Sequence, residues 1–177
     1  MARASRKTRT EAAAAAREPV EAVLPARDVA LEADPAVTRG RYAAILAGIA
    51  VAGAAIALYL TWVKLAGGIP ACGPLAGCET VQTSDYSSIL GIPVSVLGLV
   101  YQLTILGLVL AWWRTGESRA LMATYALGLV GVAFAAYLVY LQLFVIHAVC
   151  TWCAAFDALV VAGFIAAVVT YVRTAER

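Results

Sequence analysis

Residues 42–63 read YAAILAGIAVAGAAIALYLTWV, a run of 22 amino acids without a charged side chain. A helix of this length rises about 1.5 Å per residue and crosses a hydrocarbon layer about 30 Å thick. Charged residues bound the run, since Arg39 and Arg41 precede it and Lys64 follows it. The run therefore predicts a membrane-spanning helix over about residues 42–64.

Two further uncharged stretches extend this pattern along the chain. One covers residues 92–113, and the other covers residues 120–156, which is too long for a single span. The polar and small residues 147–153 are the expected break in the longer stretch. The pattern predicts an all-α membrane protein, a four-transmembrane-helix bundle with helices over about residues 42–64, 92–113, 120–146 and 150–172.

The composition agrees with a membrane protein and excludes two other classes. Hydrophobic residues make up 63% of the 177 residues and charged residues only 14%, whereas a soluble domain has about 25% charged residues. The chain therefore lacks the polar surface of a soluble globule. Four cysteines are also too few for a small disulfide-stapled scaffold. The expected surroundings are a lipid bilayer, and no nucleic-acid partner is expected.

The distribution of basic residues predicts one orientation in the membrane. Residues 1–41, 114–119 and 173–177 hold 12 of the 13 basic residues, and Lys64 is the remaining one. Cytoplasmic segments of membrane proteins are enriched in Lys and Arg. We therefore expect both termini in the cytoplasm and a capping loop over residues 65–91 outside it. Lys64 is expected to extend to the lipid headgroups.

The two ends of the chain are predicted to be cytoplasmic tails. Residues 1–41 are rich in Ala, Arg and Glu and contain three prolines. Nothing in this segment can bury a sizeable apolar face, so we expect a mostly disordered tail. Residues 173–177 are expected to form a short C-terminal tail.

This orientation places all four cysteines on one outer side of the membrane. Cys72 and Cys78 lie in a loop rich in Gly and Pro, and Cys150-Thr-Trp-Cys153 opens the fourth helix. Disulfides persist in the oxidising compartments outside the cytoplasm. At a helix start, backbone N–H groups and the helix dipole stabilise the thiolate that attacks disulfides. The C-x-x-C spacing therefore favours dithiol–disulfide exchange, with the loop pair as a second redox pair.

Two other interpretations of the cysteines remain open at this point. The four thiols could bind structural zinc, although the spacing is unusual for a zinc site, and no metal is expected. They could instead form two inert disulfides that only staple the loops of a non-catalytic membrane scaffold.

The segment that follows Cys78 carries a resemblance to a known family. The sequence resembles the vitamin K epoxide reductase family, in its bacterial branch, over about residues 42–172. Four features carry the resemblance: the loop cysteine pair, Ser84 six residues after Cys78, the Gly-Ile-Pro-Val sequence at residues 91–94, and the C-x-x-C motif at the fourth helix.

The resemblance implies a quinone-linked thiol oxidoreductase in a bacterial cell membrane. A separate thioredoxin-like partner outside the cytoplasm would pass electrons to the loop pair, and so support disulfide formation in exported proteins. Its thiolate would attack Cys78 and release Cys72, which would attack Cys150. The freed Cys153 would lie against a membrane quinone, menaquinone or ubiquinone, with Ser84 beside the quinone ring. All four cysteines are then catalytic.

Two positions depart from the animal members of the family. Those members place an Asn near the position of Val94 and a Tyr at the position of Asp157. Both departures count against a vitamin-K-type quinone or epoxide reductase, which is the alternative activity within the family. Asp157 lies four residues after Cys153, and a carboxyl group within a membrane is a candidate for a functional site. We expect Tyr86, Ile89 and Leu90 to rest an apolar face of the capping loop on the bundle.

Overall fold

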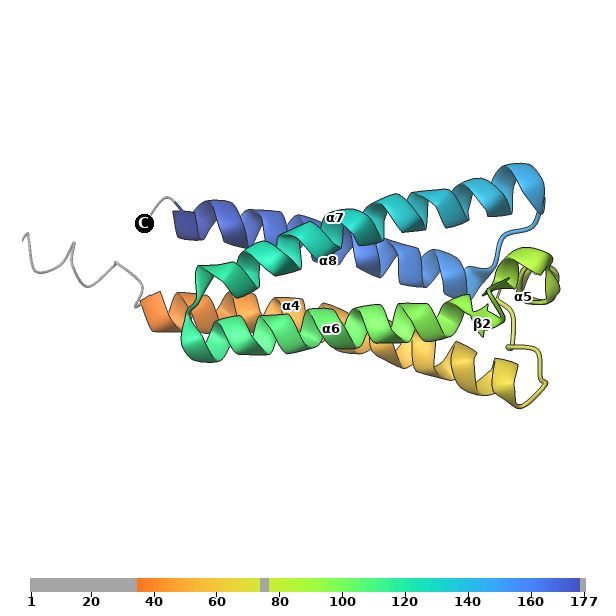
Figure 1. Cartoon of the computed structure of the whole chain (residues 1–177), viewed down its shortest axis with the longest axis horizontal. Coiled ribbons are helices and arrows are strands. Elements are labelled where there is room, and N and C mark those ends of the chain that lie inside the picture. Colours follow the sequence, from red (N-terminus) through yellow and green to blue (C-terminus); the bar gives the residue numbers. More distant parts are fainter. Residues whose placement is uncertain (1–34, 74–76, 176–177) are drawn as a thin grey trace, which may run out of the picture. The chain divides into compact units, whose positions relative to one another are not determined.

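Long helices dominate the structure (Figure 1). The computed structural model describes residues 35–73 and 77–175. Within these residues, four helices are long and apolar enough to cross a membrane. They are α4 (Pro35–Leu65), α6 (Val94–Thr115), α7 (Ser118–Tyr140), which continues into the π-helical turn η2 (Leu141–Val145), and α8 (Thr151–Ala175). The predicted fold class, an all-α membrane protein with four spanning helices, is confirmed.

The helix boundaries differ most from the sequence-based expectation at the start of α4. This helix begins at Pro35, seven residues before residue 42, so Arg39 and Arg41 are helical rather than part of a disordered tail. Proline suits the first position of a helix, and arginine is a good helix former. Residues 1–34 of the predicted N-terminal tail lie outside the described residues, as do residues 176–177.

Residues 39–177 form one unit, in which apolar contacts join the four helices. α7 packs against both α6 and α8. The buried core takes residues from every long helix, namely Ala43, Leu46, Ala50, Ile105, Val109, Trp112, Leu121 and Ala167. Large apolar side chains such as Leu58, Leu103 and Val130 remain exposed on the helices. Such extensive exposed apolar surface suits contact with lipid rather than with water.

A small cap connects α4 to α6. It contains the short helix α5 (Cys78–Thr83), the 3₁₀ turn η1 (Asp85–Ser87), and a hairpin of β1 (Ser88–Ile89) and β2 (Ile92–Pro93). The strands are antiparallel, with Ser88 opposite Pro93 and Ile89 opposite Ile92. Leu90 and Gly91 form the turn with φ angles of 52° and 82°, which is the positive-φ geometry of a tight hairpin. Because β2 takes residues 92–93, α6 begins two residues later than predicted.

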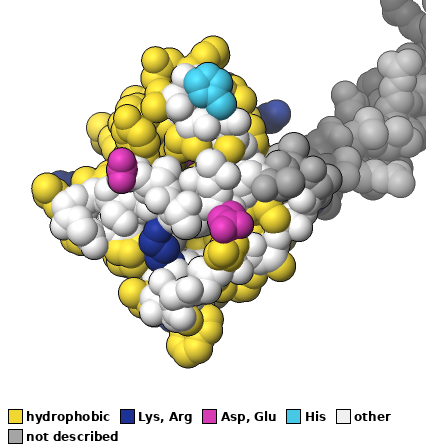
Figure 2. Space-filling model, turned by 90° about the vertical axis from the view of Figure 1, so that its right-hand side faces the viewer, with side chains coloured by type: hydrophobic (Ala, Val, Ile, Leu, Met, Phe, Trp, Pro, Cys, Tyr) yellow, Lys and Arg dark blue, Asp and Glu magenta, His cyan; other side chains and the backbone are white. Residues whose placement is uncertain are grey.

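The hairpin does not rest its apolar side chains on the bundle. Ile89 is exposed and Leu90 is 98% exposed, so the expectation was wrong for these two residues. Tyr86 is also exposed, but it lines a cavity together with residues of the long helices. The two-residue turn places Leu90 at the tip of the hairpin, where no other element covers it. Figure 2 shows this end of the molecule, where few charged side chains interrupt a surface of hydrophobic and uncharged groups.

The cap and the segment between η2 and α8 lie at the same end of the bundle, whereas the α6–α7 turn lies at the other end (Figure 1). Gly116 forms that turn in the left-handed conformation, with a φ of 70°, and its N–H bonds to the carbonyl oxygen of Trp112. The arrangement gathers both cysteine pairs at one end of the four helices.

Candidate functional site: two cysteine pairs beside a cavity

The loop pair is joined by a disulfide between Cys72 and Cys78, with 5.7 Å between their Cα atoms. Cys78 is the first residue of α5, and its N–H donates a hydrogen bond of 3.1 Å to the Cys72 sulfur. The two cysteines differ in accessibility. Cys78 is 0% exposed, whereas Cys72 is an exposed residue. A large protein can therefore approach this disulfide at Cys72 and not at Cys78.

The second pair lies at the start of α8. Cys150 directly precedes the helix and is 0% exposed, and Cys153 lies in the first turn. The N–H of Cys153 points to the Cys150 sulfur at 3.4 Å. Both cysteines are in the thiol form in this structure. The first turn of a helix also supplies unpaired N–H groups and the positive end of its dipole, which favour a thiolate at this place.

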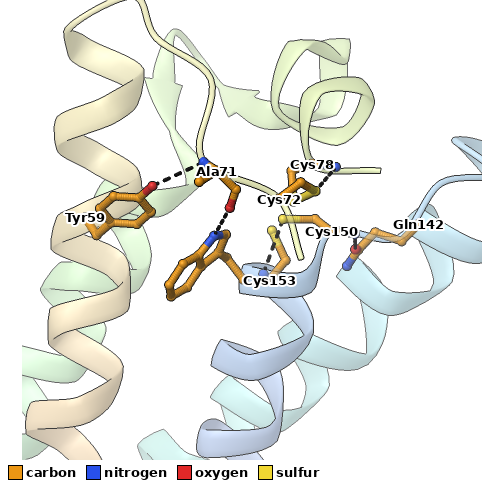
Figure 3. The surroundings of a disulfide bond; sticks show 8 residues. Tyr59, Ala71, Cys72, Cys78, Gln142, Cys150 and Cys153 are labelled. Carbon is orange, nitrogen blue, oxygen red and sulfur yellow. Dashed lines mark hydrogen bonds between the residues drawn. A yellow bond between two sulfur atoms is a disulfide. The ribbon is translucent and has the colours of Figure 1, made fainter. Parts of the chain in front are cut away.

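The residues next to each pair bring the two pairs together. A side chain at Gly77 would overlap the backbone of Val149, which precedes Cys150, with its Cβ 2.6 Å from the Val149 oxygen. A Cβ atom at Gly73 would lie 3.1 Å from the Thr151 side chain. The chain flanking the loop disulfide therefore packs directly on both neighbours of Cys150. Figure 3 shows the resulting cluster of four sulfur atoms.

Trp152 ties the start of the cysteine loop to α8. Its indole N–H donates a hydrogen bond of 2.7 Å to the carbonyl oxygen of Ala71, and the N–H of Ala71 donates one of 3.2 Å to the Tyr59 hydroxyl. The Tyr59 and Trp152 rings lie 4.9 Å apart between centroids. These contacts, drawn in Figure 3, fix the residue before Cys72 between α4 and α8.

Gln142 holds the backbone of Cys150 from the opposite side (Figure 3). Its side-chain oxygen accepts a hydrogen bond of 2.9 Å from the Cys150 N–H, and its carbonyl oxygen accepts one of 3.0 Å from Ala148. Gln142 lies in the π-helical turn η2 and is 4% exposed. π-Helical turns are often found at functional sites, and here the turn positions a side chain that orients a reactive cysteine.

We expect Gln142→Leu to destabilise the protein and slow thiol exchange. The change leaves the Cys150 N–H buried without a partner, which costs about 1–3 kcal/mol. A misplaced Cys150 should slow exchange with the loop pair roughly 10- to 100-fold. Thermal unfolding and stopped-flow thiol exchange would measure the two effects.

Gln102→Leu is the matched control for this change. Gln102 is 2% exposed, and its side-chain nitrogen has no hydrogen-bond partner. Leucine at this position removes an unpaired polar group, so stability and exchange rate should stay near those of the unmodified protein. An equal loss of stability and of exchange rate in both variants would show that Gln142 matters only as a buried side chain.

Cys150 is adapted to react as a thiolate. A hydrogen bond from the Cys153 side chain, with weaker backbone hydrogen bonds from Cys153 and Trp152, lowers the pKa of the Cys150 thiol from 9.0 to about 7, although burial opposes this shift. The thiolate is the nucleophilic form. Cys150 is therefore the member of its pair that is prepared to attack a disulfide or close one.

A thiolate titration tests this property directly. We expect Cys150 to ionise as the pH rises through about 7, observed as thiolate absorbance while the Cys72–Cys78 disulfide stays intact. Cys153→Ala removes the main cause of the lowered pKa, so the midpoint should rise toward the ordinary 9.0. Cys150→Ala should abolish this ionisation step in the thiolate absorbance. A midpoint near 7 that persists in Cys153→Ala would contradict this assignment.

A cavity of about 210 Å³ lies beside Cys153, between the helices and under the cap. Its lining is mostly apolar, and it includes Cys153 but not Cys150. Ser84 lines it as well, and the Ser84 hydroxyl donates a hydrogen bond of 2.7 Å to the carbonyl oxygen of Val81. Val94 and Asp157 also line this cavity. An apolar cavity of about 150 Å³ holds a benzene molecule, so this space fits the ring of a quinone.

Lys64 holds the cap over this cavity, a role that its sequence position did not indicate. Its ammonium group donates hydrogen bonds to the carbonyl oxygen of Gln82 and, at 2.9 Å, to the Ser87 hydroxyl. Both acceptors belong to residues that line the cavity. Lys64 therefore bonds to the cap rather than extending to lipid headgroups. Its hydrogen bonds join the end of α4 to α5 and η1.

A bundle of four membrane helices with two adjacent cysteine pairs, one of which reaches an apolar cavity between the helices, defines a membrane redox protein. Residues 44–168 match the sequence profile of the vitamin K epoxide reductase family, and the chain belongs to this family. No individual curated protein shows significant similarity to the chain. Family membership makes the protein a membrane oxidoreductase.

Proposed function

We propose that the protein oxidises a thioredoxin-like protein outside the cytoplasm and reduces a membrane quinone. The observation that carries this proposal is the position of the second cysteine pair. The neighbours of Cys150 contact the loop that holds the disulfide, and Cys153 lines the apolar cavity. The pair thus connects a surface-accessible disulfide to a space that fits a quinone ring.

We infer an order of thiol transfer that is opposite to the one implied by the sequence resemblance. A partner thiolate reaches the exposed Cys72 and forms a mixed disulfide there, and Cys78 leaves as a thiolate. The buried Cys78 then attacks Cys150 of the Cys150–Cys153 disulfide, and Cys153 leaves as a thiolate inside the cavity. The second thiolate of the partner displaces Cys72, and the partner leaves as a disulfide. Cys72 then attacks Cys78 to close the loop disulfide again, and Cys150 leaves as a thiolate. This order is supported by the burial of Cys78, since an outside protein cannot reach a sulfur that is 0% exposed.

Each residue has a defined part in the second half of the reaction. The quinone, as second substrate, accepts two electrons and two protons. The Cys153 thiolate bonds to the quinone, and the Cys150 thiolate then attacks the Cys153 sulfur. The S–S bond forms as the bond between Cys153 and the quinone breaks, and the electron pair of the broken bond stays on the quinone, which becomes a quinol once it has taken up two protons. Ser84 and the apolar lining orient the ring and exclude water. The net change converts a partner dithiol and a quinone into a partner disulfide and a quinol.

We further propose that the cysteine end of the bundle faces the outside of a bacterial cell membrane, with both termini in the cytoplasm. The distribution of basic residues supports this orientation. Labelling of single-cysteine variants with a membrane-impermeant thiol reagent would test it. Cys72 should react from outside in intact cells, and labelling only after the membrane is opened would contradict the orientation.

The activity is tested with purified protein in liposomes. A reduced thioredoxin-like protein and a short-chain ubiquinone or menaquinone are added, and partner disulfide and quinol are measured together. We expect one quinol for each partner dithiol oxidised. A parallel assay with vitamin K epoxide tests the alternative activity. Thiol oxidation without quinol would contradict the proposal, and so would cysteines that resist the reduced partner, as structural disulfides in a scaffold should.

A further inference from the structure

One buried acidic group in the cavity is not used by the relay of cysteines. Asp157 is 6% exposed, and one of its carboxyl oxygens is buried without a hydrogen-bond partner. A polar atom in this state is costly unless something else satisfies it. An unpartnered carboxyl oxygen in a ligand-sized cavity indicates that a bound molecule supplies the missing partner.

The helix places Asp157 next to the redox-active sulfur. Cys153, Asp157 and Val160 are separated by four and three residues on α8, which puts them on one face of the helix, and all three line the cavity. Asp157 is the one carboxyl group among the lining residues, and no Lys, Arg or His lines the cavity with it. A carboxyl group can donate a proton when it is protonated and can accept a proton when it is ionised.

We propose that Asp157 is the acid that donates a proton to the bound quinone, an inference that rests on the proposed quinone reductase activity. Cys150 and Cys153 lose two electrons and two protons when their two thiols become one disulfide. The quinone gains both electrons and both protons. In this step an O–H bond of Asp157 breaks and an O–H bond forms on a quinone oxygen, and a proton released by the thiols restores the carboxyl group.

The quinone half of the reaction tests this role by itself. The protein is reduced at Cys150 and Cys153, mixed with a short-chain quinone, and followed by quinol formation and by thiol labelling. Asp157→Asn keeps the shape of the side chain but removes the acid. We expect it to slow this half-reaction about 100-fold, the smaller end of what a positioned acid contributes. Exchange between the loop pair and Cys150 should keep its normal rate, and Asp157→Glu should recover part of the lost rate.

Asp85→Asn is the matched control, because Asp85 is exposed and does not line the cavity. The quinone half-reaction of this variant should keep the rate of the unmodified protein. Quinone binding to Asp157→Asn should stay within a few-fold of normal. A rate equal to that of the unmodified protein would overturn the proposal, and lost binding would make Asp157 a binding residue instead. If the unmodified protein passes no electrons from thiols to quinone, the proposed function itself fails.

A second measurement needs no variant at this position. In the unmodified protein, infrared difference spectra should show a change in a protonated carboxyl band when quinone binds, and the quinone half-reaction should be slower in D₂O than in H₂O. Asp85→Asn should retain the infrared change. Absence of both effects would overturn the proposal, even if Asp157→Asn failed to fold.

Discussion

Cys153→Ser is expected to reduce the rate of thiol-driven quinone reduction to that of the uncatalysed reaction. Cys153 is the cysteine that lines the cavity, and a serine hydroxyl can neither be oxidised to a disulfide nor deliver electrons. The loss should reach about 10⁴-fold or more, which is typical when the central nucleophile of a linked set is removed. Quinol formation in liposomes with a reduced thioredoxin-like protein would measure it.

The same variant should accumulate a covalent intermediate. Without Cys153 the C-x-x-C pair has no second thiol to displace Cys78 from Cys150, so a disulfide between these two residues should accumulate while a partner that retains only its attacking cysteine occupies Cys72. Peptide mapping without reductant would identify it. Ala155→Ser adds a hydroxyl at an exposed position of the same helix and should leave turnover unchanged. Residual quinol formation by Cys153→Ser above the uncatalysed rate would show that electrons leave the protein by another group.

The long-range organisation of the protein was predictable because it depends on simple patterns. Uncharged runs of about 20 residues specify membrane helices wherever they occur, and the break near residues 147–153 was marked by polar and small residues. The start of α4 was not predictable in the same way. Charged side chains such as those of Arg39 and Arg41 end an apolar run, but they do not end a helix.

The cysteine pairs and Ser84 could be selected from the sequence because each belongs to a motif with recognisable spacing. Gln142 and Lys64 belong to no such motif. Their roles arise from contacts with residues 8 to 23 positions away, which only the packed bundle brings within hydrogen-bond distance. The sequence did single out Asp157 as a carboxyl group inside the membrane. Its burial without a partner and its place in the cavity required the structure.

The loop cysteines should behave differently toward an outside protein, and this difference distinguishes the two possible orders of transfer. In Cys78→Ser the remaining Cys72 is exposed, so a thioredoxin-like partner that retains only its attacking cysteine should form a mixed disulfide with it. In Cys72→Ser the remaining Cys78 is buried at the start of α5, so this adduct should be nearly absent.

Each variant also tests a second prediction, which concerns the loop cysteine that forms a disulfide with Cys150. When each change is combined with Cys153→Ser, mild oxidation of the Cys72→Ser protein should join Cys78 to Cys150, whereas the Cys78→Ser protein should yield little linkage between Cys72 and Cys150. Gels run without reductant, followed by peptide mapping, would separate these products, and quinone reduction with the partner should be lost in both variants. A partner adduct at Cys78, together with a Cys72–Cys150 linkage, would restore the order implied by the sequence resemblance. The burial of Cys78 favours the opposite result, because a thiolate enclosed between the cap and α8 has Cys150, and not the solvent, within its reach.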